Sequence, residues 1–122
     1  MLFRSESQLV DWAALRSRFN RNESFLHRLA SSAMPSLDEA DKKLAAGIAQ
    51  NDYQPLIFAA HTLRGLAGNL FAQRVVDLAK ATDNAARREQ PEAFALAGQL
   101  ICLLDTLRGE LSAFSGATDG AD

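Results

Sequence analysis

The chain has 122 residues, 48% of them hydrophobic and 23% charged, which is the composition of one soluble domain with a core of its own. A formal net charge of −2 gives no support to a nucleic-acid partner, and the single cysteine, Cys102, excludes an internal disulfide. No apolar run approaches the ~20 residues of a membrane span, and the N-terminus lacks the long apolar stretch of a secretory signal. We therefore expect a cytoplasmic protein, or a cytosolic domain of a larger one, without direct membrane contact.

Helical periodicity recurs along the chain, with no convincing strand pattern and no internal repeat. A first helix is predicted over about residues 6–19. Asn22 is placed to cap a second helix, which keeps its apolar phase across Pro35 and ends near residues 50–51. A proline inside a helix normally kinks or ends it, so the preserved phase favours one long kinked helix over two unrelated ones.

Three further helices complete the pattern. Asp52 is placed to cap a helix that runs to about Asn69, with Pro55 tolerated in its first turn. A fourth helix is predicted over about residues 72–88. The last, over about residues 90–114, carries a near-heptad apolar stripe.

Helices of this length joined by short connections pack best side by side in alternating directions. We therefore predict an all-α fold, an antiparallel four-helix bundle with an additional N-terminal helix that covers one end or one side. Residues 1–114 would form this single domain. Residues 115–122 are small and polar, and we expect them to be a disordered tail.

The most informative segment is His61 to Leu70, which reads His-Thr-Leu-Arg-Gly-Leu-Ala-Gly-Asn-Leu. At about 100° per residue, His61 points away from the apolar stripe of its predicted helix. Four residues surround it on this outward face: Ile57, Arg64, Gly65 and Gly68. A glycine inside a helix costs about 1 kcal/mol relative to alanine, so two beside one histidine need a reason. The simplest is clearance, because without a Cβ a partner can approach the imidazole closely.

Several interpretations of His61 compete. It could be a solvated surface histidine with no task. A metal ligand is disfavoured, since His27, His61 and Cys102 show no ligand spacing. An acid–base residue of an enzyme would need a nucleophile motif and a site that excludes water. A neutral imidazole can also accept a phosphoryl group itself, which requires exposure and a nearby cation such as Arg64, one helical turn away.

The residues His61-Thr62-Leu63-Arg64-Gly65, followed by Gly68-Asn69-Leu70, resemble the signature of histidine-containing phosphotransfer (HPt) domains. That signature is His-x-Leu-Lys/Arg-Gly, a pair of small residues, and Gly-Asn-Leu-Gly. The break at Asn51-Asp52, the Ala33-Met34-Pro35 step and the helix carrying Leu78 and Asp83 extend the resemblance over about residues 9–114.

The resemblance implies a phosphorelay intermediate without kinase activity of its own. His61 would carry the phosphoryl group on Nε2, and Arg64 would hold the phosphate or face the partner's acidic pocket. Gly65 would leave space for the partner, and Gly68 would have a related packing or clearance role. Asp83 stands where the family often has a glutamate or glutamine that bonds the other ring nitrogen and holds the tautomer; its alternative is a solvated carboxylate.

The implied partners are response-regulator receiver domains or a hybrid sensor histidine kinase, of which the chain could itself be the C-terminal domain. It would act as a monomer with no cofactor of its own, since the receiver would supply Mg²⁺. Five residues are candidates for the docking surface or its basic rim: Ile57, Arg64, Phe71, Lys80 and Arg87.

Two residues depart from the family pattern. Leu66 replaces a serine or alanine, and Phe71 replaces a glycine or another small residue. Leu66 falls on the core stripe and could be a packing variant. Phe71 could anchor the turn after the His61 helix or belong to a partner-specific docking surface. These departures keep a non-catalytic interaction module as the alternative, with a small helical enzyme third if a deep polar pocket surrounds His61.

Overall fold

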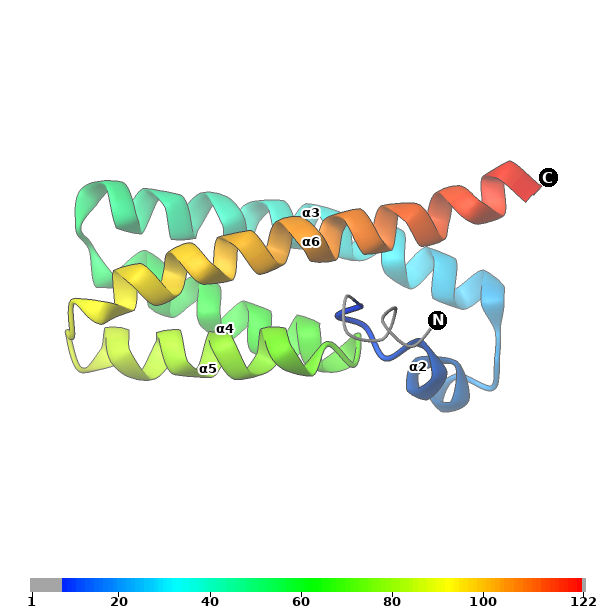
Figure 1. Ribbon diagram of the computed structural model, residues 1–122, viewed down its shortest axis with the longest axis horizontal. Helices are drawn as coiled ribbons and strands as arrows, with labels where there is room; N and C mark the ends of the chain where they lie inside the picture. The colour runs from blue at the N-terminus through cyan, green and yellow to red at the C-terminus, as the bar shows by residue number, and fades with distance from the viewer. Residues whose placement is uncertain (1–7, 122) are drawn as a thin grey trace.

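The computed structural model describes the backbone of residues 8–121 and the side chains of residues 8–114. This part of the chain has no strand and contains five helices: α2 (Trp12–Arg18), α3 (Glu23–Gln50), α4 (Tyr53–Asn69), α5 (Gln73–Arg87) and α6 (Glu92–Ala121). The last four run antiparallel in chain order and form a bundle, in which α3 and α5 each pack on α4 and α6 (Figure 1). The predicted fold, an antiparallel four-helix bundle with an additional N-terminal helix, is confirmed.

The helices of the bundle differ in length, and this difference makes room for α2. α3 and α6 have 28 and 30 residues, whereas α4 and α5 have 17 and 15. The longer pair extends past the turn between α4 and α5, and α2 lies at that end of the molecule (Figure 1). The first helix therefore covers one end of the bundle.

Side-chain caps fix where α3 and α4 begin, as their sequences predict. Asn22 accepts a hydrogen bond from the backbone N–H of Phe25 at 3.0 Å, and Asp52 accepts one from Gln54 at 3.1 Å. Each satisfies an N–H that the first helical turn leaves without a partner. Pro35 lies inside α3 without ending it, on the exposed side, where water can solvate the carbonyl that the proline leaves free.

The core of the bundle is a column of leucines. Ten of them are at most 1% exposed: Leu26, Leu37, Leu44, Leu56, Leu63, Leu70, Leu100, Leu104, Leu107 and Leu111. They come from α3, α4 and α6 and from the residue that ends α4. Within each helix they are separated by three, four, seven or eleven residues, which keeps them on one helix face. Burying each such side chain contributes about 1.5–3 kcal/mol, so these stripes fix how each helix is rotated about its axis.

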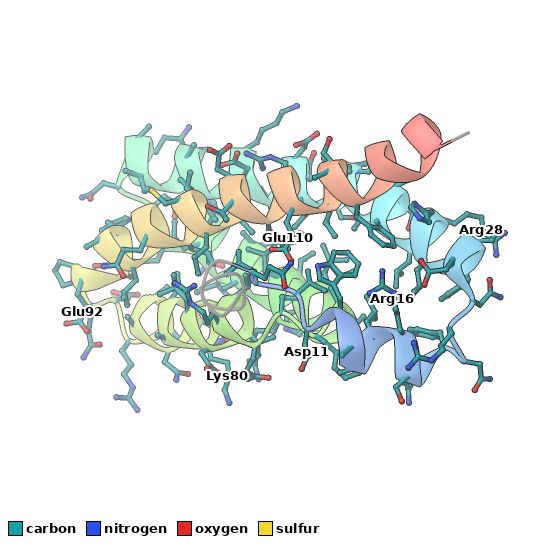
Figure 2. The ribbon with its side chains drawn as sticks, turned by 45° about the vertical axis from the view of Figure 1, so that its right-hand side comes forward. Asp11, Arg16, Arg28, Lys80, Glu92 and Glu110 are labelled. Carbon is teal, nitrogen blue, oxygen red and sulfur yellow. The ribbon has the colours of Figure 1, made fainter. Side chains whose placement is uncertain are left out.

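The prediction of a first helix over residues 6–19 is too long. Residues 6 and 7 lie outside the described part of the chain, and α2 begins only at Trp12. The backbone N–H groups of Leu9 and Val10 donate instead to the carboxylate of Glu110, at 2.7 and 3.1 Å, and the Trp12 indole N–H donates to it at 2.8 Å. Figure 2 shows Glu110 on α6 at the side that faces Asp11. A carboxylate on α6 thus holds this segment out of the helix.

The expectation of a disordered tail differs from the structure. α6 continues through Ala121 as a helix, which includes residues 115–121. A helix that is already formed extends at little cost, because each added residue gains a hydrogen bond without a new nucleus. Residue 122 lies outside the described residues.

Gly47 is the glycine on which the turn between α3 and α4 depends. It is buried, and a Cβ at this position would collide with the Cδ1 atom of Leu56 and lie 2.9 Å from the carbonyl oxygen of Asp52. Gly98 and Gly109 on α6 have no such neighbour within 4 Å. Only the first of these glycines is therefore required by the packing of the fold.

We predict that Gly47→Ala lowers the free energy of unfolding by about 1–3 kcal/mol, since the added methyl group must displace a core leucine and a turn carbonyl. The matched control, Gly109→Ala, should raise it by about 0.5–1 kcal/mol, because alanine is the better helix former. Urea unfolding followed by circular dichroism measures both. Equal effects of the two substitutions would contradict the packing described for the α3–α4 turn.

Candidate functional site

His61 lies in the middle of α4 with its side chain exposed to solvent. Ala60 and Leu63, which lie just before and after His61 on the same helical turn, are fully buried. Their burial fixes the rotation of α4 and therefore directs the imidazole to solvent. Within the described residues the His61 side chain makes no hydrogen bond and no ion pair. The predicted outward placement is confirmed, and both ring nitrogens are open to a partner.

The two glycines beside His61 have no packing role within the domain. Gly65 and Gly68 are exposed, and among the described residues a Cβ built on either would meet no heavy atom within 4 Å beyond its own helix backbone. Neither has a positive φ, so neither is needed for the backbone conformation. The packing alternative for Gly68 is therefore not supported, and clearance for an incoming molecule is the explanation that fits both positions.

Asp83 on α5 is the one buried carboxylate within the described residues, with a side chain only 4% exposed. Its Oδ1 accepts from Nε of Arg87 at 2.7 Å, and its Oδ2 lies 3.4 Å from Nη1 of Arg64 on the neighbouring helix. The guanidinium side chains are 43% and 57% exposed, so they extend from a buried anion to the surface. Paired charge-assisted bonds offset the cost of removing the carboxylate from water.

This arrangement corrects both expectations for Asp83. Its carboxylate does not bond the imidazole of His61, because both of its oxygens face arginines. Nor is it a solvated carboxylate at the edge of the stripe, because it is buried. Aspartate is one methylene shorter than glutamate, and the two arginines lie within its reach. Arg64 therefore lies next to His61 on α4, as expected, and its guanidinium is held by Asp83 on the neighbouring helix α5.

The contact between Arg64 and Asp83 also shows the register of the antiparallel pair α4 and α5. His61 lies one turn before Arg64 on α4, and Arg87 lies one turn after Asp83 on α5. Because the two helices are antiparallel, His61 and Arg87 lie at the same level along the bundle. The same count places Lys80 beside the turn that carries Gly68, where Lys80 is exposed and points away from the bundle (Figure 2). The predicted basic rim therefore follows the α4–α5 seam on one flank of His61.

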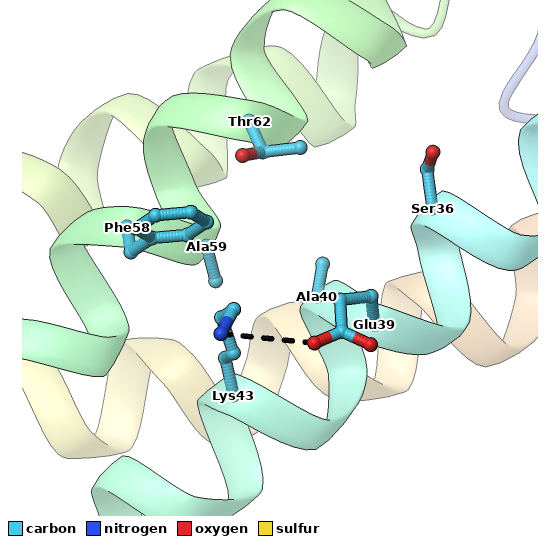
Figure 3. Close-up of a pocket in the computed structure, with 7 residues that line it drawn as sticks. All are labelled: Ser36, Glu39, Ala40, Lys43, Phe58, Ala59 and Thr62. Atoms are coloured by element: carbon cyan, nitrogen blue, oxygen red, sulfur yellow. Dashed lines mark ion pairs between the residues drawn. The ribbon is translucent and has the colours of Figure 1, made fainter.

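The opposite flank carries a residue that the sequence analysis missed. Phe58, one turn before His61, is 60% exposed, and Nζ of Lys43 lies 4.7 Å from the centre of its ring. A shallow groove of about 100 Å³ lies beside Phe58. Residues of α3 and α4 line it, as Figure 3 shows: Ser36, Glu39, Ala40, Lys43, Phe58, Ala59 and Thr62. The available signal was an aromatic residue about 60° from His61 on the helix and well off the apolar stripe.

Phe71 anchors the turn at the end of α4. Its φ of 56° lies in the left-handed region that favours glycine. The N–H groups of Phe71 and Ala72 donate to the carbonyls of Gly68 and Ala67 at 3.1 and 2.9 Å, which closes the helix end. The backbone carbonyl of Phe71 accepts a hydrogen bond from the backbone N–H of Asp11 at 3.0 Å. The half-buried Phe71 ring packs on the core.

The other sites named from the sequence divide between core and surface. Leu66 is half-buried and packs against the core, as expected of a packing variant. Ile57, one turn before His61, is also half-buried against the core. Phe71 lies ten residues beyond His61, about 15 Å along the helix. A docking role for Phe71 therefore stays a prediction, whereas its structural role is evident.

Two properties of residues 8–121 bear on other classes of function. None of the helices in this range combines the length and the apolar character that a membrane crossing requires. The same residues contain no group of three or more His, Cys, Asp or Glu side chains arranged to hold a metal ion.

Comparison with known proteins identifies one family. The model of the Hpt domain family matches residues 24–117, a span that includes His61, both glycines and Asp83. No curated protein and no solved structure gives a match. Because the matched span is more than three quarters of the chain, this chain belongs to the Hpt domain family, whose members carry phosphoryl groups in phosphorelays.

Proposed function

We propose that this chain is a histidine phosphocarrier in which His61 accepts a phosphoryl group from an aspartate of one receiver domain and passes it to another. One observation carries the proposal: a free imidazole stands on a helix face that two glycines clear, with an arginine at its edge. A convex face of this kind offers no enclosure for substrate, but it suits a protein partner that brings the rest of the active site.

In the proposed step the Nε2 lone pair of neutral His61 attacks the phosphorus of an aspartyl phosphate. The bond between phosphorus and the aspartate oxygen breaks, and the carboxylate leaves with that electron pair. In the second transfer a carboxylate of another receiver attacks the same phosphorus, and the imidazole leaves with the electrons of the P–N bond. No nucleotide takes part in either step, so the domain needs no kinase activity of its own.

The charged groups near His61 have a defined task in this scheme. Arg64 and Arg87 lie on the α4–α5 flank of the imidazole. There Arg64 can neutralise phosphoryl oxygens, and both arginines can face the acidic pocket of a receiver. We propose that the receiver also holds the Mg²⁺ that neutralises the transferring group, and that the chain binds no cofactor itself. It would work as a cytoplasmic monomer, either alone or as a domain of a hybrid sensor histidine kinase.

A second candidate function is a docking module that binds receivers without transfer. The exposed ring of Phe58 favours it, since aromatic residues are enriched in the contact surfaces between proteins. A receiver that reaches His61 must also cover Phe58, one turn away. The two functions therefore share a surface and differ in whether His61 is modified.

We predict that a phosphorylated receiver labels the wild type and that His61→Gln abolishes the label, while the fold keeps its stability because His61 lies off the core. The label should be stable to base and labile to acid, as expected of a phosphohistidine. His27→Gln is the matched control, because it removes the other histidine of the chain and should leave labelling intact. A folded wild type that no receiver in a panel can label would favour the docking module.

We further predict that Gly65→Ala separates stability from function. It should raise the free energy of unfolding by about 0.5–1 kcal/mol, since the added Cβ meets nothing within the domain. It should slow transfer from a receiver about tenfold or more, because that Cβ occupies space the partner needs. Gly109→Ala on α6 should be stabilising to a similar extent with unchanged transfer. An unchanged transfer rate in Gly65→Ala would refute the clearance role.

A further inference from the structure

Arg64, Asp83 and Arg87 form a three-residue cluster, here called the arginine clasp, that links α4 to α5 beside His61. We propose that Asp83 is a positioning residue that competes with the phosphoryl group of phospho-His61 for Arg64. On phosphorylation Arg64 would leave Asp83 for the phosphoryl group, and Arg87 would stay. This inference rests on the proposed function of His61 and concerns how strongly the domain retains its phosphoryl group.

The two contacts within the clasp are unequal. Arg87 holds Asp83 at 2.7 Å from the same helix, four residues away, whereas Arg64 reaches it from the neighbouring helix at 3.4 Å. The contact of Arg64 is the longer one, and it joins two helices rather than two residues of one helical turn. Arg64 is therefore the arginine that the cluster releases more readily.

A phosphoryl group on His61 would be a strong competitor for Arg64. Residues three apart on a helix have Cβ atoms about 5–6 Å from each other, within easy reach of an arginine side chain. A phosphoryl group carries close to two negative charges at neutral pH and three acceptor oxygens, whereas Asp83 offers one charge. We expect the guanidinium to turn from Asp83 towards the larger charge on the exposed side.

The second arginine explains how the buried carboxylate tolerates this change. A buried anion that loses its only partner is strongly destabilised. Asp83 is 4% exposed, but it keeps the short bond from Arg87 when Arg64 leaves. The clasp can therefore give up one arginine without leaving a buried charge unpaired, which a simple two-residue ion pair could not do.

The consequence is that the domain holds the phosphoryl group on His61 less strongly than it would if Arg64 had no contact with Asp83. Part of the attraction between Arg64 and phospho-His61 is offset by the contact with Asp83 that must break. Asp83→Asn keeps the shape of the side chain, removes its charge and weakens that competing contact. It should therefore shift the transfer equilibrium towards phospho-His61.

The first experiment observes the clasp directly, without a receiver. The wild-type domain is phosphorylated with phosphoramidate, a small P–N donor, and the arginine Nε–Hε signals are followed by ¹H–¹⁵N NMR. The Arg64 signal, assigned from its absence in Arg64→Gln, should move on phosphorylation, and the Arg87 signal should stay near its original position. An unmoved Arg64 signal, or a larger movement of Arg87, would overturn the proposal.

The second experiment measures the equilibrium constant for transfer between a receiver and the domain, in variants shown by circular dichroism to be folded. Asp83→Asn should raise the phospho-His61 fraction about three- to tenfold over the receiver-bound fraction. That gain should persist in an Arg87→Gln background and fall below twofold in an Arg64→Gln background. A purely structural role for Asp83 would not produce this dependence on Arg64.

The outcomes distinguish a failure of the proposed competition for Arg64 from a failure of the proposed relay function. If Asp83→Asn has the same effect in both backgrounds, or loses it only with Arg87→Gln, the clasp does not act through Arg64 and the proposal is wrong. If no receiver exchanges phosphoryl groups with the wild type, the proposed relay function fails. The phosphoramidate experiment still decides the clasp in that case, because it depends only on chemical phosphorylation of His61.

Discussion

Burial of one stripe of α4 is the constraint on which the rest of the site depends. Leu56 and Leu63 from this helix, and Leu70 at its end, are wholly buried against the neighbouring helices. Turning α4 about its axis would expose them at a cost of about 1.5–3 kcal/mol each, so the helix has one rotational setting. That setting directs His61 to solvent, Arg64 towards α5 and Phe58 towards α3. The burial of the core leucines thereby determines which residues lie on each side of His61.

The two flanks differ in chemistry, and the glycines occupy the space between them. Along the α4–α5 seam lie cations, two of them tied to a buried carboxylate. Along the α3–α4 groove lies an exposed aromatic ring that a lysine covers in part. A partner that reaches His61 meets charge on one side and an apolar surface on the other. The glycines lower the intrinsic stability of α4 and leave that approach open, so the site trades stability for access.

Local sequence signals predicted the parts of the structure that local physics determines. The caps at Asn22 and Asp52, the continuous helix through Pro35 and the outward direction of His61 all follow from periodicity and hydrogen-bonding groups within a few residues. The start of the first helix was predicted wrongly because it depends on contacts distant in the chain. Leu9 and Val10 stay out of the first helix because the carboxylate of Glu110, about a hundred positions away, accepts hydrogen bonds from their backbone N–H groups.

Asp83 illustrates the same limit within the site. Its position predicted a place near His61, but its partners depend on which arginines the packing of α4 on α5 brings within reach. Phe58 was missed for a different reason. Its place near His61 and off the apolar stripe could be read from the sequence, but one exposed aromatic residue does not by itself distinguish a contact surface from chance. Both residues needed the assembled bundle before a function could be assigned.

The most direct test of the central claim is a chase of the phosphoryl group through the domain. A sample labelled with ³²P by one receiver, and freed of it, is mixed with a second, unlabelled receiver, and both proteins are counted over time. The account predicts that the label leaves His61 and appears on the aspartate of the second receiver in equal molar amount. A label that remains on the domain, or that peptide mapping places on a residue other than His61, would contradict it.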